Sequence, residues 1–112
     1  SVGFMSLLAE AAAQSADAGI DPQSFVDVLA GGGGASVALD RLSPFIVNGD
    51  REALPFAISN ALKDFDYYRQ MSAQSGAQVE IADGVYGALS KVVEMGAGDA
   101  YVPELVQHFR KG

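Results

Sequence analysis

Few side chains in this sequence have types and spacings that could carry chemistry. His108 is the only histidine, and the chain has no cysteine. No serine or carboxylate is placed by sequence to form a relay with His108. The Asp and Glu residues are scattered without a pair whose spacing would shift their pKa values, so they give no sign of general acid and base catalysis. We therefore expect His108 to be a surface or subunit-contact residue.

A metal site is not expected. With one histidine and no cysteine, the ligands would have to be oxygen atoms, and the sequence contains no D-x-[DN]-x-[DN]-G loop that could supply them.

The tetraglycine of residues 31–34 is the most conspicuous local feature. A glycine-rich turn before a helix can bind an anion through its backbone N–H groups. This turn lacks the Gly-Lys-Ser/Thr ending of a phosphate-binding loop and follows a predicted helix, where that motif requires a strand. We therefore interpret it as a flexible connector.

Lys63 lies in the middle of a predicted helix, on a polar flank that also carries Asn60, Asp64, Tyr67 and Gln70 at spacings of one, three or four residues. A solvated lysine is the ordinary outcome of such a pattern. A lysine that contacts a ligand is the alternative, and spacing alone does not decide between the two.

The elements that must position these residues are predicted to be helices, because the segments are long, rich in alanine and poor in alternating β-branched residues. Asp21-Pro22 and Ser36 are start signals, whereas Gly19 is a stop signal. Pro44 is expected to kink or break its helix, and Pro55 to open the next one. The predicted helices cover residues 2–18, 22–30, 36–44, 55–76, 79–95 and 103–109. The fold class is all-α, a single domain of about five to six helices.

Composition limits the partners. The 112 residues include 7 Lys and Arg against 14 Asp and Glu, a net charge of −7, so no basic stripe is available for nucleic acid or an anionic membrane. No apolar run approaches the ~18 residues of a membrane helix. Without cysteine there is no disulfide framework, and cytoplasm is the expected compartment. A dinucleotide-dependent enzyme usually needs a second domain of about this size, so the chain is too short to be one alone.

Several segments in order resemble the C-terminal helical domain of the β-hydroxyacid dehydrogenases, which include 3-hydroxyisobutyrate dehydrogenase, tartronate semialdehyde reductase and relatives of 6-phosphogluconate dehydrogenase. The resemblance runs essentially from end to end. It rests on Ala9-Glu10-Ala11, Ala18-Gly19-Ile20-Asp21-Pro22, Val28-Leu29, Ser36, Phe56 seven residues before Lys63-Asp64, and Gly96-Ala97-Gly98-Asp99.

The resemblance implies a C-terminal substrate and oligomerisation domain over residues 1–112, cut on its N-terminal side, with the Rossmann domain outside this chain. It implies NAD or NADP as cofactor of the parent enzyme, with Lys63 beside the bound cofactor, Phe56 near the same cleft and Asp64 orienting the helix. The reaction would be hydride transfer at the hydroxyl of a small 3-hydroxy acid.

The family's catalytic lysine precedes the segment that resembles Ala9-Glu10-Ala11 and lies outside this sequence. We therefore expect no catalytic residue in the chain, weak or no cofactor binding and no turnover by the chain alone. Phe65, Tyr67 and Tyr68 replace the smaller residues usual after the Lys-Asp pair and could reshape the substrate pocket.

A noncatalytic interaction module is the alternative function. It would use the acidic surface and an apolar flank of the first helix to bind a partner protein. The same flank, with Phe4, Met5, Leu7 and Leu8, leads us to expect homo-oligomers through the first or last helix.

Overall fold

The computed structural model describes residues 2–111, and within them the chain forms six α-helices and no strand. The all-α prediction is confirmed. The helices are α1 (Val2–Asp17), α2 (Pro22–Ala30), α3 (Val37–Asn48), α4 (Ile58–Gln74), α5 (Glu80–Val92) and α6 (Leu105–His108). Short turns connect them: η1 (Arg51–Ala53), η2 (Val93–Ala97) and η3 (Val102–Glu104).

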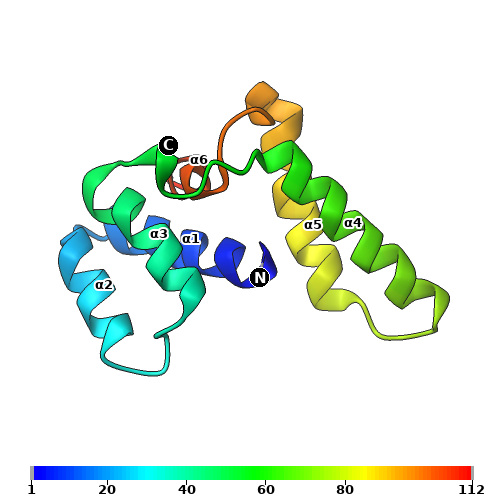
Figure 1. The fold of residues 1–112 in the computed structure, drawn as a ribbon, viewed down its shortest axis with the longest axis horizontal. Coiled ribbons are helices and arrows are strands. Elements are labelled where there is room, and N and C mark those ends of the chain that lie inside the picture. Colours follow the sequence, from blue (N-terminus) through cyan, green and yellow to red (C-terminus); the bar gives the residue numbers. More distant parts are fainter. Residues whose placement is uncertain (1, 112) are drawn as a thin grey trace.

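Figure 1 shows two parts, with α1, α2, α3 and α6 packed into a helical body and α4 and α5 forming an antiparallel helical hairpin beside it. The body and the base of the hairpin share one hydrophobic core. Leu39 and Leu42 of α3 and Leu105 of α6 are fully buried with Ile58 of α4 and Leu89 of α5. The base of the hairpin is therefore anchored in the core of the body.

The predicted capping residues set the ends of the first three helices. The Asp21 carboxylate accepts a hydrogen bond from the backbone N–H of Ser24 at 3.1 Å, and the Ser36 hydroxyl accepts one from Leu39 at 3.1 Å. Gly19, with φ of 81°, follows the end of α1. The Asp21 and Ser36 side chains thus satisfy N–H groups that the first turn of a helix leaves without partners.

Two predictions about proline were wrong, namely that Pro44 could break its helix and that Pro55 would open the next one. Pro44 does not break α3, which continues to Asn48. Its missing N–H removes only the bond to the carbonyl of Asp40, an exposed residue where water can take its place. Pro55 does not open α4, because it lies in a tight turn in which the N–H of Phe56 donates to the carbonyl of Leu54 at 2.8 Å. Ala57 then forms an isolated antiparallel bridge with Tyr101 before α4 begins at Ile58.

This bridge is part of a junction that joins the hairpin to the last segment of the body. The backbone N–H of Ile58 donates to the carbonyl of Ala100 at 2.8 Å, and the N–H of Val102 donates to the carbonyl of Phe56 at 2.9 Å. The start of α4 is therefore held by backbone groups more than 40 residues away in the chain.

Inside the hairpin, Arg69 of α4 connects the two helices. Its guanidinium pairs with Asp66 at 2.9 Å and with Asp83 of α5 at 3.1 Å, and it lies 4.0 Å from the centre of the Tyr86 ring. The hydrogen bonds to Asp66 and then Asp83 raise the pKa of Arg69 above its usual value. These contacts brace the hairpin as one unit.

The far half of α4 does not reach the core. Only Ile58 and Ala61 of this helix are buried, and Met71 is 70% exposed. Among the described residues, no helix has the length and apolar character needed to cross a bilayer.

Candidate functional site

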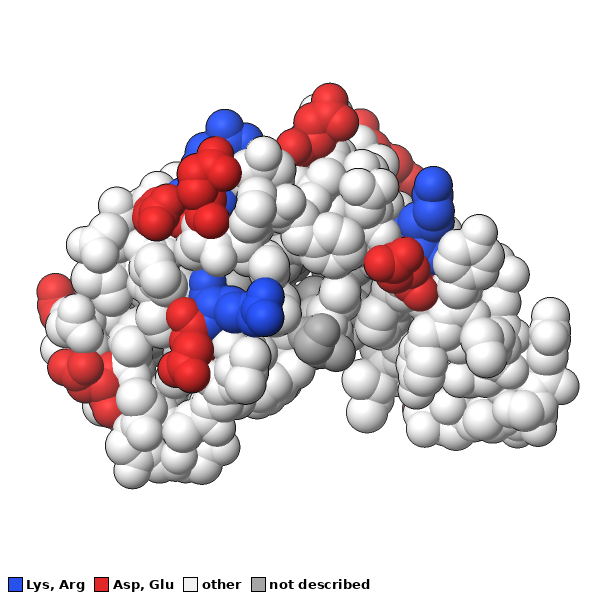
Figure 2. Space-filling view, in the orientation of Figure 1, with Lys and Arg blue, Asp and Glu red and all other residues white. Residues whose placement is uncertain are grey.

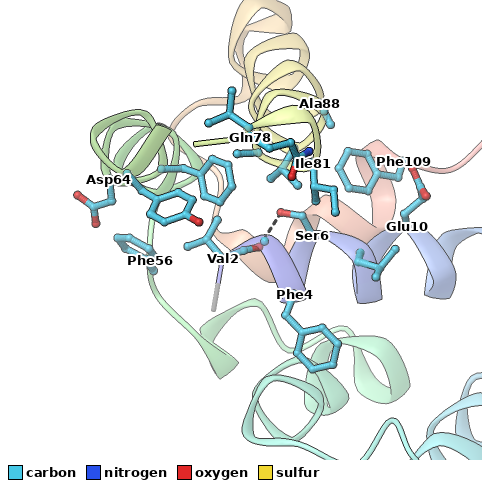
Figure 3. A pocket seen from close by; sticks show the side chains of 18 residues that line it. Val2, Phe4, Ser6, Glu10, Phe56, Asp64, Gln78, Ile81, Ala88 and Phe109 are labelled. Carbon is cyan, nitrogen blue, oxygen red and sulfur yellow. Dashed lines mark hydrogen bonds between the residues drawn. The ribbon is translucent and has the colours of Figure 1, made fainter. Parts of the chain in front are cut away.

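An open cleft of about 1170 Å³ separates the first half of α1 from the hairpin. Figure 2 shows the hollow between the two parts, and Figure 3 shows its walls from close by. Val2 and Leu7 come from α1, Phe65 from α4, Val85 from α5 and Phe109 from the end of the chain. The walls are thus built from segments that are distant in sequence.

The lining of the cleft is mainly apolar, and the charge it carries is negative. Among the described residues that line it, the charged ones are Glu10 and Asp64. The hydroxyl of Ser6 donates to the carbonyl of Val2 at 2.8 Å and is already used within α1. The interior of the cleft therefore offers apolar surface and carboxylates, and it disfavours an anionic group.

Of the two residues predicted to contact the cofactor, Phe56 lines this cleft and Lys63 does not. Phe56 is half-buried and lines the cleft together with Asp64, and Figure 3 shows the two side chains near each other beside α4. Lys63 is exposed and does not line the cleft. Within residues 2–111, Lys63 takes part in no ion pair, so its charge is not neutralised by a protein carboxylate.

The N-terminus of α4 cannot replace Lys63 as an anion-binding group. A free helix N-terminus attracts anions through its first N–H groups. Here the N–H of Ile58 donates to the carbonyl of Ala100 and the N–H of Ser59 donates to the carbonyl of Gly98 at 2.9 Å.

The polar flank predicted around Lys63 is confirmed, since Asn60 and Gln70 are exposed as well. Positive charge on this side of α4 therefore comes from Lys63.

The bulky residues after the Lys-Asp pair divide into two groups. Phe65 and Tyr68 line the cleft, and their ring centres lie 5.9 Å apart. Tyr67 does not line the cleft and is 62% exposed on the flank that carries Lys63. The expectation that these residues shape a pocket concerns Phe65 and Tyr68, whose side chains form part of the wall.

The other sequence candidates lie away from the cleft. Neither His108, at the end of α6, nor the tetraglycine between α2 and α3 lines it. Within the described part of the chain, no group of three or more His, Asp or Glu residues is placed to hold a metal ion.

The sequence did not reveal how the first helix is divided between the core and the cleft. Met5 and Leu8 are buried, so the expectation that they belong to an unpaired apolar flank was wrong. Phe4 and Leu7 are 44% and 59% exposed and line the cleft. Ile81 of α5, which is 80% exposed, was missed because an apolar residue at helical spacing is ordinarily assigned to the core.

The structure is thus an all-α domain with an apolar cleft, and next to the cleft-lining Asp64 it carries a lysine that forms no ion pair within residues 2–111. The family model described as "NAD-binding of NADP-dependent 3-hydroxyisobutyrate dehydrogenase" matches residues 1–109. The chain belongs to this family of NAD(P)-dependent oxidoreductases, whose members bind a nicotinamide cofactor. A search of curated protein sequences found no match.

Proposed function

We propose that residues 1–112 are the C-terminal helical domain of an NAD(P)-dependent dehydrogenase that acts on the hydroxyl group of a small 3-hydroxy acid. The domain would close one side of the active-site cleft and contribute subunit contacts. The observation that carries this proposal is the family match over residues 1–109. It is supported by Phe56 in the wall of the cleft and by Lys63, which is exposed and directly precedes the cleft-lining Asp64.

Phe56 and Lys63 have the chemistry needed to bind an anionic nucleotide. Lys63 is a cation without a protein partner among the described residues, and an ammonium group is a common ligand of phosphate and carboxylate oxygens. Phe56 offers a half-buried ring at the cleft wall. A bound nicotinamide would supply the hydride acceptor or donor, which no side chain of this domain can provide.

The charges around the cleft would orient the ligands. The lining carboxylate of Asp64 repels phosphate or carboxylate groups from the apolar interior, and Lys63, the next residue back along α4, attracts them to the outer edge. In this proposal Lys63 binds and positions the cofactor, Phe56 contacts it, and the group that handles the hydroxyl proton comes from outside residues 1–112.

Activity measurements on the enzyme that contains this chain behind an NAD(P)-binding domain test the proposal. A panel of small hydroxy acids should include at least one that supports NAD(P)-linked oxidation. Lys63→Ala should lower kcat/KM by more than about tenfold, or ~1.4 kcal/mol. Lys91→Ala, which removes an exposed lysine on α5 away from the cleft lining, is the matched control. Absence of NAD(P)-linked oxidation with every acid, or normal turnover by Lys63→Ala, would contradict the proposal.

A further inference from the structure

Tyr67 is an exposed aromatic residue that the fold itself does not use. Of the four tyrosines, Tyr68 packs against Phe65, Tyr86 lies under Arg69 and Tyr101 lies under Arg51 at 4.6 Å. Among the described residues, Tyr67 has no such aromatic or cationic partner and remains 62% exposed. An aromatic face in this position is available to a ligand.

The position of Tyr67 on α4 relates it to both Lys63 and the cleft. Four residues after Lys63, it lies about 6 Å farther along the helix axis and about 40° around it. Asp64, which lines the cleft, lies about 100° around from Lys63 in the same direction. Tyr67 is therefore placed between the unpaired cation and the mouth of the cleft.

We propose that Tyr67 is the stacking platform for one aromatic ring of the cofactor, with the neighbouring phosphate on Lys63. This inference rests on the proposed function and extends it to a residue for which the family resemblance gives no role. The ligand chemistry is a planar heteroaromatic ring joined through a ribose to a phosphate. That chemistry occurs in both halves of a nicotinamide dinucleotide.

The surrounding charges favour this arrangement. A phosphate on Lys63 stays on the exposed flank, away from Asp64 and Glu10 in the cleft. The uncharged ring can then extend toward the cleft across Tyr67, where stacking removes apolar surface from water. Asn60, also exposed on this flank, lies one turn before Lys63 and can donate to or accept from a ribose hydroxyl.

Binding of NADH, AMP and NMN to the enzyme that contains this chain behind an NAD(P)-binding domain tests the inference, with dissociation constants obtained by calorimetric titration. Tyr67→Ala should weaken the binding of NADH and of one of the two half-molecules, AMP or NMN, by about tenfold, which corresponds to ~1.4 kcal/mol. Tyr67→Phe should change these affinities by at most about twofold, because the ring remains. The affected half-molecule identifies which ring stacks on Tyr67.

Met71→Ala is the matched control, since this large side chain lies one turn beyond Tyr67 on α4, is 70% exposed and does not line the cleft. It should leave the half-molecule affinities unchanged. If Lys63→Ala weakens NADH binding but Tyr67→Ala does not, the stacking role is wrong and the proposed function stands. If the unaltered enzyme binds none of the three probes, or neither variant alters binding, both proposals are overturned. Unfolding midpoints of the variants separate lost binding from lost structure.

Discussion

The backbone N–H of Ser59 donates to the carbonyl of Gly98 at 2.9 Å, and a Cβ atom placed on Gly98 would lie 3.3 Å from the Cβ of Ser59. The first turn of α4 and the segment before α6 therefore approach one another closely. This contact explains why glycine occupies position 98 in a motif that the sequence resemblance singled out. The same contact sets the position of the first turn of α4 relative to the helical body. Phe56 precedes this turn, and Lys63 follows it on α4.

Adding a methyl group at this contact should destabilise the protein. The Ser59 side chain cannot easily retreat, because its own backbone is hydrogen-bonded to Gly98, so Gly98→Ala should lower the free energy of unfolding by about 1 kcal/mol or more. Gly96→Ala should cost about 1–2 kcal/mol, because φ at Gly96 is 89°. Urea unfolding measures both changes.

Gly87→Ala provides the control for these substitutions. A Cβ at Gly87 inside α5 would meet nothing within 4 Å, so this change should stabilise the helix by about 0.5–1 kcal/mol. Equal destabilisation by all three substitutions would show that the contact between Ser59 and Gly98 has no special role.

The end of the chain should detach from α1 in acid. The Asp17 carboxylate accepts hydrogen bonds from the backbone N–H of Lys111 at 2.8 Å and from the Arg110 guanidinium at 2.6 Å, and these lower the pKa of Asp17. Because the folded pKa is lower than the unfolded one, the stabilisation is present above about pH 4 and is lost as pH falls through the folded value. The protection factor of the Lys111 amide, which compares its hydrogen exchange with that of an unstructured peptide at the same pH, should fall in that range.

Asp17→Asn tests the cause of that change. The variant lacks the titrating carboxylate, so protonation at position 17 can no longer change the stability of this contact. The protection factor of the Lys111 amide should therefore show no transition below about pH 4. A transition that persists in Asp17→Asn would assign the acid response to another group.

Self-association is the third expected behaviour. Phe4, Leu7 and Ile81 expose apolar side chains on both walls of the cleft, and such surface tends to be covered by another chain. Light scattering at rising protein concentration should show a mass above that of the monomer, and Ile81→Lys should reduce it. Strictly monomeric behaviour at high concentration, or no effect of Ile81→Lys, would contradict this expectation.

The sequence predicted the parts of the fold that depend on local signals. Asp21, Ser36 and Gly19 act on their own helix ends, so their roles could be read from neighbouring residues. The start of α4 could not, because the bridge between Ala57 and Tyr101 pairs distant segments and keeps Pro55 outside the helix.

The candidate site was predicted only in part for a related reason. Phe56 and Lys63 are proposed as site residues from the ordered resemblance, and the exposed polar flank of α4 was predicted from helical spacing. The cleft was missed because α1, α4, α5 and Phe109 meet there only after folding. Helical spacing also does not show how far the core extends along α4, where Met71 is 70% exposed at the far end of the hairpin.

The most direct test of the account follows the backbone amide signals of this domain, ¹⁵N-labelled within the enzyme that carries it behind an NAD(P)-binding domain, while NADPH or NADH is added. The account predicts saturable shifts centred on Phe56 and the first half of α4, with much smaller shifts in α2 and α3. Lys63→Ala should weaken the response by about tenfold, or ~1.4 kcal/mol, and Lys91→Ala should not. Shifts centred on the tetraglycine or on α6, or an unchanged response in Lys63→Ala, would contradict the assignment of the cofactor edge to Phe56 and Lys63.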